Sequence, residues 1–306
     1  METVVSGIRP TGKLHLGNYF GAVKNFIRMQ NEFNCYFFIA DYHSLTTIHD
    51  AKTLRENTSD VALDYLALGL NPEKAVFFRQ SDVPEVTELA WIFSTVTNMG
   101  LLERAVSFKE KIEKGIDASV GLFYYPILMA ADILIYRSTL VPVGKDQIQH
   151  VEMTQDIAGK FNRTYANIFP IPEYKLDKES KVPGIDGQKM SKSYGNFIDI
   201  FLPDKELLKV IKTIQTDSTP LEEPKNPDTC NVFTLFKLLA NEEQIAEMRN
   251  NYLKGGYGYG HAKTALYELI LSKFEKPRAR YNELMSNTDL LEKELQVGEA
   301  KARARA

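Results

Sequence analysis

The sequence predicts an α/β protein with a doubly wound parallel sheet, followed by a C-terminal all-helical domain. Three observations carry this prediction. Short β-rich runs alternate with longer helical patterns in the first part of the chain, glycine-containing loops follow several of these runs, and β-rich runs disappear after about residue 200. Strands that are separated by helices usually pair in parallel. In such sheets ligands bind at the carboxyl ends of the strands.

Four apolar runs are predicted to be buried strands: 3–7 (TVVSG), 35–40 (CYFFIA), 75–79 (AVFFR) and 140–144 (LVPVG). Between them, apolar side chains recur at spacings near 3.6 residues in 19–33 and 53–68, which is the period of a helix with one buried face. These runs predict a Rossmann-like sheet. Its ligand-binding edge would carry the loops SGIRPTG, ADYHS and PVGKDQ.

Helical patterns occupy the remainder of the chain. The segments 204–217, 231–253, 262–287 and 289–306 are separated by Pro and Gly clusters at 219–227 and 255–260, which are typical helix breakers. We therefore expect a Rossmann-like catalytic domain in 1–190 and a helical domain in 191–306. The stretch DGQKMSKSYGN, 186–196, lies at the join, where hinges are common.

Composition limits the compartment and the kind of partner. The chain has 306 residues, 44% of them hydrophobic, and a formal net charge of −3, so a nucleic acid would have to be bound by local basic patches. Two cysteines far apart in sequence fit a reducing cytoplasm better than a disulfide framework. The N-terminus lacks the pattern of a signal peptide. The most apolar run, 124–136, is too short to span a membrane.

Two glycine-containing segments are candidates for a phosphate site. In RPTGKLHLGN, 9–18, glycines let the backbone approach a ligand, and His15 and Asn18 can donate to phosphate oxygens near a helix N-terminus. In KMSKS, 189–193, two lysines lie three positions apart with a serine beside each. Taken alone, the first segment fits an ordinary strand–helix turn equally well, and the second fits a solvated lysine-rich hinge.

Together the two segments resemble the HIGH and KMSKS motifs of the class I aminoacyl-tRNA synthetases. KMSKS is matched letter for letter, and HLGN differs at its last position, Asn18 for histidine. The resemblance implies ATP as a substrate, with Mg²⁺ held mainly by the ATP phosphates and no metal site in the protein. It implies a catalytic group of Lys189, Lys192, His15 and Lys111. It implies an ATP-binding set of Arg9, Pro10, Thr11, Gly17, Asn18, Gly144, Lys145, Asp146, Val182, Lys189, Met190, Ser191, Lys192 and Ser193.

Amino-acid activation is chemistry that such residues can catalyse. A substrate carboxylate attacks the α-phosphorus of ATP and pyrophosphate leaves, so the protein has to align ATP and stabilise the leaving group rather than supply a base. Lysines on a mobile loop can form contacts that are stronger in the transition state than in the ground state. We expect Lys189 and Lys192 to bind the pyrophosphate. PVGKDQ resembles the family's ribose element, although a capped helix N-terminus would have the same pattern.

Asp132 is the only ionisable acid in the apolar run 124–136. A buried carboxylate needs a partner, which leaves an N-cap, an ion pair with a distant arginine, or a bond to a ligand. On a helix, Met129 and Tyr125 lie on the same face as Asp132, so the carboxylate would have an apolar wall beside it. A flat ring with one N–H donor suits such a site, and indole is such a ring.

The segments YYPILMAADIL and VPVGKDQIQH resemble tryptophanyl-tRNA synthetases of the bacterial type, over essentially the whole chain. The resemblance implies that Asp132 binds the indole N–H and that Tyr125 and Gln147 bind the ammonium or carboxylate of the substrate. It adds His43, Met129, Val141 and Val143 to the ring pocket, with Val5 where relatives have an aromatic residue. It also implies L-tryptophan and tRNA(Trp) as partners, a homodimer, and anticodon binding by 191–306.

Other functions remain open at this point. A tyrosyl-tRNA synthetase of similar fold would be expected to carry a polar residue at Met129, to bind a phenol. A nucleotidyltransferase that acts without tRNA would not need the helical domain. A regulatory or RNA-binding paralogue would not need an intact KMSKS segment and His15. The basic segments 275–280 and 301–306 fit either solvated helix faces or phosphate contacts with tRNA.

Overall fold

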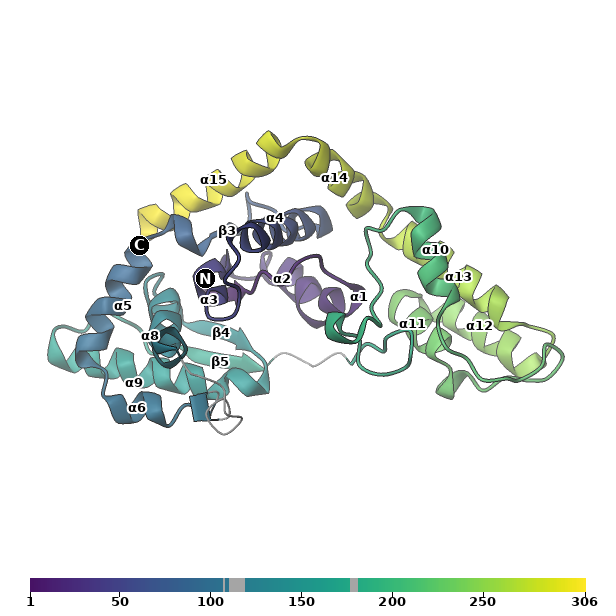
Figure 1. Cartoon of the computed structure of the whole chain (residues 1–306), viewed down its shortest axis with the longest axis horizontal. Helices are drawn as coiled ribbons and strands as arrows, with labels where there is room; N and C mark the ends of the chain where they lie inside the picture. The colour runs from purple at the N-terminus through teal and green to yellow at the C-terminus, as the bar shows by residue number, and fades with distance from the viewer. Residues whose placement is uncertain (107, 110–118, 177–180) are drawn as a thin grey trace.

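The computed structural model of the chain describes residues 1–106, 108–109, 119–176 and 181–306 (Figure 1). Its centre is a five-stranded parallel sheet in the order β3-β2-β1-β4-β5. The strands are β1 (Thr3–Ile8), β2 (Asn34–Ile39), β3 (Val76–Arg79), β4 (Leu140–Val143) and β5 (Glu173–Leu176). The prediction of a Rossmann-like α/β fold is confirmed.

The four predicted strands are present within about one residue of their expected bounds. The fifth strand, β5, was not predicted from the sequence. It forms the outer edge of the sheet, and all four of its residues are exposed. A strand at an exposed edge has no need of the continuous apolar run that identifies a buried parallel strand, so the residues EYKL carry no such signal.

The helices of the sheet domain cover both faces of the sheet. They are α1 (Leu16–Asn18), η1 (Tyr19–Val23, a π-helical turn), α2 (Lys24–Met29), α3 (Asp41–Ser44), α4 (Ala51–Leu68), η2 (Gln80–Asp82), α5 (Glu85–Val96), α6 (Met99–Glu103), α8 (Val120–Leu134), η3 (Lys145–Gln147) and α9 (Ile148–Thr164). Val4 and Phe37 of the sheet pack with α2 and α4. Their neighbours Val5 and Phe38 pack with α5, α8 and α9. Successive side chains of a strand point to opposite faces, so burial on both sides requires nearly continuous apolar runs.

The remainder of the chain is helical, as predicted. It contains η4 (Lys192–Tyr194), α10 (Asp204–Lys212), η5 (Pro227–Thr229), α11 (Asn231–Leu239), α12 (Glu242–Lys254), α13 (Tyr259–Lys273), α14 (Glu275–Ser286) and α15 (Thr288–Arg305). The predicted segment 231–253 is two helices, because Asn241 and Gln244 form a capping box that starts α12. The segment 262–287 also divides, at Phe274. No helix of the described residues is long and apolar enough to cross a bilayer.

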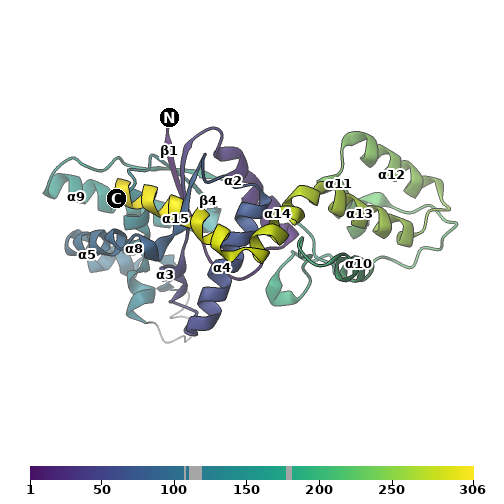
Figure 2. The ribbon, with the colours of Figure 1, turned by 90° about the horizontal axis from the view of Figure 1, so that it is seen from above.

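The last two helices return to the sheet domain (Figures 1 and 2). α14 packs on α4, and α15 packs on β3. At Gly298 of α15, a Cβ would lie 1.8 Å from the carbonyl oxygen of Phe77, so only glycine allows this approach of helix to strand. α15 thereby covers the sheet edge at β3. The expected boundary near residue 190 therefore does not separate α14 and α15 from the sheet domain.

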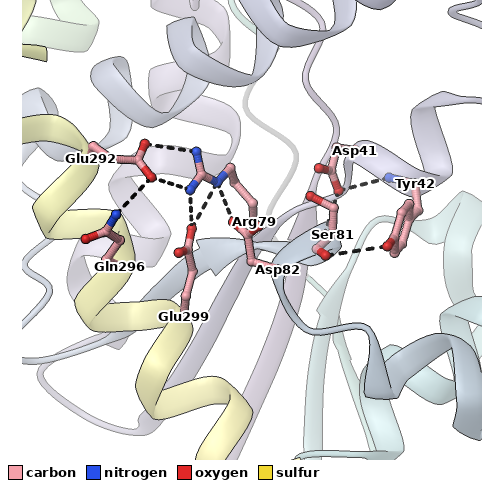
Figure 3. A network of polar contacts seen from close by, with 8 residues as sticks. All are labelled: Asp41, Tyr42, Arg79, Ser81, Asp82, Glu292, Gln296 and Glu299. Atoms are coloured by element: carbon pink, nitrogen blue, oxygen red, sulfur yellow. Dashed lines mark hydrogen bonds and ion pairs between the residues drawn. The ribbon is translucent and has the colours of Figure 1, made fainter. Parts of the chain in front are cut away.

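Arg79, the last residue of β3, binds α15 through its guanidinium (Figure 3). It donates to both oxygens of Glu292, at 2.7 and 3.0 Å, and to Glu299 Oε1 at 2.7 Å. Its Nε also donates to Asp82 Oδ2 at 2.6 Å. One cation thus faces three carboxyl groups. Burial, together with a hydrogen bond to Asp82, raises the pKa of Glu299 to about 8, so this carboxyl keeps its proton near neutral pH.

The stability of the protein should depend on the Glu299 proton. Between the ordinary pKa of a glutamate and about 8, the folded chain binds this proton and the unfolded chain does not, so the free energy of unfolding falls as pH rises through this window. Glu299→Gln keeps a donor but does not titrate. We expect the variant to lose less stability than the native chain between about pH 6 and pH 9, measured by urea unfolding. Identical pH dependence of the two proteins would contradict this assignment.

Candidate active site

A cavity of about 1030 Å³ opens at the carboxyl edge of the sheet, where the loops after β1, β2 and β4 meet α8 and the KMSKS segment. The central strand β1 lies between β2 and β4, and the crevice at such a change of strand order is the usual ligand site of doubly wound sheets. From the predicted ATP set, the cavity is lined by Arg9, Gly17, Asn18, Gly144, Val182, Lys189, Met190 and Ser191, and the predicted catalytic His15 also lines it. From the predicted amino-acid set, it is lined by Val5, His43, Tyr125, Met129, Asp132, Val141, Val143 and Gln147.

Six other predicted residues, all of them described by the structure, are not part of the cavity lining: Pro10, Thr11, Lys145, Asp146, Lys192 and Ser193. All of them except Thr11 are next in the chain to a residue that lines the cavity. An ideal Cβ on Gly144 would lie 2.7 Å from Asp146 Oδ1, so the Asp146 carboxylate adjoins the glycine that lines the cavity. The predicted Lys111 lies outside the described residues.

The carboxylate of Asp132 is buried at one end of the cavity. Asp132 lies near the end of α8, whose N-cap is Ser119, so the N-cap interpretation is wrong. The side chain is 2% exposed. His43 Nε2 lies 2.7 Å from Asp132 Oδ2, and Gln80 Nε2 donates to Oδ1 at 2.8 Å and to Oδ2 at 3.0 Å. The observed partners of Asp132 in the described chain are thus His43 and Gln80, rather than the arginine considered from the sequence.

The hydrogen bonds from His43 and Gln80 favour the ionised form of the Asp132 carboxylate, although its surroundings are apolar. Burial raises the pKa of Asp132, whereas the hydrogen bonds from His43 and Gln80 lower it. An ionised carboxylate offers about four acceptor positions. His43 and Gln80 together make three contacts with it, so Asp132 has capacity for one further N–H donor from a ligand.

An apolar wall adjoins the carboxylate. Tyr125 and Met129 come from the same helix as Asp132, and Val141 and Val143 come from β4. The hydroxyl of Tyr125 is hydrogen-bonded to His150 Nε2. This part of the cavity therefore combines apolar side chains with the buried carboxylate of Asp132.

His15, which also lines the cavity, caps the short helix α1. Its Nδ1 accepts the N–H of Asn18 at 3.2 Å, and Asn18 Oδ1 accepts the N–H of His15 at 3.1 Å. Because an accepting ring nitrogen carries no proton, neutral His15 has its proton on Nε2 and can donate from there. Burial, aided by the charge of Lys192, lowers the pKa of His15 to about 4. The ring is therefore neutral at physiological pH.

The two predicted phosphate segments are in direct contact. The N–H of Gly17 donates to Met190 Sδ at 3.2 Å, and Lys192 Nζ donates to the carbonyl oxygen of Thr11 at 2.8 Å. A Cβ on Gly17 would lie 2.9 Å from the ring of His15, so glycine is required where HLGN meets KMSKS. Burial lowers the pKa of Lys192, and nearby carboxylates, with Asp64 the strongest, oppose this effect.

Two buried side chains of the site were not predicted from the sequence. The first is Gln80, described above as a donor to Asp132. The second is Asn196, whose Oδ1 accepts from the N–H of Ser191 at 2.8 Å and whose Nδ2 donates to Asp186 at 2.8 Å and to the Lys189 carbonyl at 3.2 Å. Asn196 thus determines the shape of the KMSKS loop. Gln80 directly follows a predicted strand, but its partners Asp132 and Tyr42 lie far from it in sequence. Asn196 ends the recognised KMSKS stretch and bonds residues within it, which no sequence pattern indicates.

Comparison with known proteins agrees with this geometry. A family model described as tRNA synthetases class I (W and Y) matches residues 2–275. A tryptophan–tRNA ligase of Fusobacterium nucleatum subsp. nucleatum is 53% identical over 305 residues, covering 99% of this chain and 94% of the relative. The crystal structure of tryptophanyl-tRNA synthetase from Campylobacter jejuni complexed with ADP and tryptophan has a TM-score of 0.94 at 49% identity, covering 99% of this chain and 95% of that chain. The tryptophanyl-tRNA synthetase of Mycoplasma pneumoniae has a TM-score of 0.76 at 30% identity, covering 100% of this chain and 94% of that chain. The chain therefore belongs to the class I tRNA synthetases of the tryptophan and tyrosine family.

Proposed function

We propose that this protein activates L-tryptophan with ATP to tryptophanyl-adenylate and transfers the tryptophan to tRNA(Trp). The observation that carries the proposal is one cavity that holds a buried acceptor beside an apolar wall at one end and the joined HLGN and KMSKS segments at the other. Relatives that match nearly the whole chain at 50% to 53% identity are tryptophan–tRNA ligases, which supports this function.

ATP is proposed to lie along the glycine-containing edge of the sheet. Gly144 leaves room for the ribose, with Asp146 as an acceptor for its hydroxyls, and the backbone of Val182 contacts adenine. The carbonyl oxygen of Val182 accepts the N–H of Met190 at 2.9 Å, so adenine and the KMSKS loop would be positioned together. The side chains at the phosphate end are ammonium, imidazole and hydroxyl groups, which bind phosphate oxygens. This donor set fits ATP that enters as its magnesium complex.

Activation then depends on charge at the leaving pyrophosphate. The carboxylate of tryptophan attacks the α-phosphorus and needs no base, because it is already ionised. Lys192 now donates to a neutral carbonyl oxygen, that of Thr11. Exchanging this acceptor for phosphate oxygens strengthens the bond as negative charge accumulates on them. Lys189, on the same loop, is proposed to act in the same way.

Lys192→Ala should lower the rate of tryptophanyl-adenylate formation by about 10²-fold or more, because the contact forms chiefly in the transition state. The dissociation constant for tryptophan should change less than about threefold, since the lysine is remote from the indole end. Stopped-flow kinetics would measure the rate and calorimetry the affinity. Lys52→Ala, at an exposed lysine of α4, is the control. A native rate in Lys192→Ala would reject the proposed role.

Selection of tryptophan is proposed to depend on Asp132. Burying an aromatic ring of about 150–250 Å² contributes roughly 4–6 kcal/mol at about 25 cal/mol per Å², and phenylalanine shares most of this. A hydrogen bond from the indole N–H to a charged acceptor contributes about 1.5–3 kcal/mol. Phenylalanine cannot form that bond, and the site would be left with an unpaired acceptor.

Asp132→Ala should therefore reduce the preference for tryptophan over phenylalanine by about 10- to 100-fold, the change equivalent to the lost hydrogen bond. Pyrophosphate exchange with each amino acid measures this ratio as kcat/KM. Asp132→Asn, which keeps the shape of the side chain, controls for loss of folding. Retained discrimination in Asp132→Ala would count against the assignment.

His15 is proposed to donate from Nε2 to a phosphate oxygen as a neutral ring. Because its pKa is lowered to about 4, its ring resonances in NMR should not change between about pH 5 and pH 8, where an ordinary histidine titrates. The exposed His49 serves as the internal reference in the same spectra. A midpoint for His15 near the ordinary histidine value would show that a charged ring binds the phosphate instead.

We further propose that the helical region binds tRNA, with α10 to α13 reading the anticodon. Lys205, Lys209 and Lys212 are exposed on α10 and can bind phosphates. In contrast, Arg278 donates to the Ile200 and Leu202 carbonyls, Lys301 donates to the Pro72 carbonyl, and Arg303 donates to Glu85. The basic segments 275–280 and 301–306 are therefore used in part within the chain, which favours their structural interpretation.

A homodimer is proposed to cover an apolar surface formed by α5, α6 and the start of α8. Its exposed side chains include Trp91 (69%), Met99 (63%) and Val120 (82%), which is more apolar exposure than isolated surface residues explain. Light scattering would measure the mass in solution. The cytoplasm is the proposed location, since Cys35 and Cys230 are buried and free, as in a reducing compartment.

The alternatives considered from the sequence are less well supported. The relatives that match almost the whole chain are named tryptophan–tRNA ligases rather than tyrosine enzymes. Their similarity includes the helical region, which a nucleotidyltransferase without tRNA would not need. A paralogue without activity is also disfavoured, because Lys192 and His15 are hydrogen-bonded and His15 and Lys189 line one cavity.

A further inference from the structure

Gln80 is buried between Asp132 and the start of α3. Its side chain is 1% exposed. The amide nitrogen donates to both oxygens of Asp132, and the amide oxygen accepts from the N–H groups of Tyr42 at 3.1 Å and His43 at 3.4 Å. Backbone N–H groups can only donate, so these partners determine which way the amide is oriented. Gln80 thus connects the helix that carries His43 with the carboxylate that His43 also contacts.

The residues on either side of Gln80 are bound to other elements. Arg79 is bound to α15 through Glu292 and Glu299, as Figure 3 shows. The N–H of Ser81 donates to Asp41 Oδ1 at 3.0 Å, and that oxygen also accepts the N–H of Tyr42. Arg79 has extended backbone torsions, and successive side chains of an extended chain point in opposite directions. Binding of Arg79 by α15 therefore holds Gln80 toward Asp132.

We propose that Gln80 is a positioning residue for amino-acid selection, and that the Arg79 cluster of α15 holds Gln80 against Asp132. The inference rests on the proposed role of Asp132 as acceptor of the indole N–H. With Gln80 in place, both carboxylate oxygens are held and one acceptor position is directed to the ligand. Without it, the carboxylate can rotate, and it loses a donor that favours its charged form. A helix at the C-terminal end of the chain thereby affects which amino acid is selected.

The docking of α15 provides a matched control, because the helix is held at several separate points. Arg303 Nε donates to Glu85 Oε1 at 2.8 Å, and Gly298 packs on the backbone of Phe77. The Arg303–Glu85 pair binds α15 to α5 in the same manner as the Glu292–Arg79 pair binds it to β3. Only the latter adjoins Gln80. Loss of either pair weakens docking, but only loss at Arg79 should affect selection.

The direct test compares Gln80→Met with Gln80→Glu. Methionine keeps the length of the side chain without its donors, and we expect the preference for tryptophan over phenylalanine, measured by pyrophosphate exchange, to fall about tenfold, equivalent to one hydrogen bond to a charged group. The change should lie in KM for tryptophan, with kcat changed less than about threefold. Glutamate has the same shape as glutamine but places a carboxylate against Asp132, so its loss should exceed that of methionine. A native preference in Gln80→Met would overturn the inference.

The indirect test removes the bonds from α15. We expect the double variant Glu292→Ala, Glu299→Ala to lower the same preference by about threefold or more, and Glu85→Ala with Arg303→Ala to leave it native. An equal loss in both double variants would overturn the inference, because docking of α15 in general would then explain the effect. If Gln80→Met does not fold, judged by circular dichroism, this comparison decides alone.

Asp132→Ala, measured in the same assay, separates the proposed role of Asp132 from that of Gln80. Native selection in Asp132→Ala rejects the role of Asp132. Loss of selection in Asp132→Ala together with native selection in Gln80→Met rejects only the role of Gln80.

Discussion

A carboxylate buried among apolar side chains has to be hydrogen-bonded, and the amino-acid end of this cavity is arranged around that requirement. Asp132 obtains its donors from His43 after β2 and from Gln80 after β3. The strands that precede these donors are paired in register, with Ile39 opposite Arg79. The acceptor that we propose for indole therefore depends on the parallel pairing of two strands as well as on α8. Its hydrogen-bond donors and its proposed specificity have the same structural origin.

At the proposed phosphate end of the cavity, burial lowers the pKa of basic groups, whereas at the amino-acid end it raises the pKa of an acid. There the ionisable groups lie close together, and the environment determines which of them stay charged. His15 is neutral because it is buried and faces Lys192, while carboxylates on other elements help Lys192 to keep its proton. A neutral donor beside mobile cations suits a site where negative charge appears only during the reaction. Gly17 allows the two segments to meet closely enough for this arrangement.

The C-terminal helices connect these ends to the helical region. α14 and α15 leave α13 and pack across α4 and β3 (Figure 2), so the chain closes on the sheet where it would otherwise have an open edge. The ion cluster at Arg79 holds α15 to the sheet, and the residue after Arg79 is Gln80, which donates to the Asp132 carboxylate that we propose for amino-acid selection. A helix contiguous with the proposed tRNA-binding region thus reaches the amino-acid site through two adjacent residues.

The sequence alone determined the features that local patterns encode. Continuous apolar runs identified the four buried strands, since burial on both faces leaves no place for polar residues, and the KMSKS and HLGN segments indicated the proposed phosphate site. The lone acid in the run 124–136 identified Asp132 as a residue with a buried partner. Only the tertiary structure decided what that partner is, because His43 and Gln80 lie far from Asp132 in sequence. The tertiary structure also decided the return of α15 to β3, because this packing depends on Gly298 and on long-range ion pairs. It decided the presence of β5 as well, because the exposed residues of that strand lack an apolar pattern.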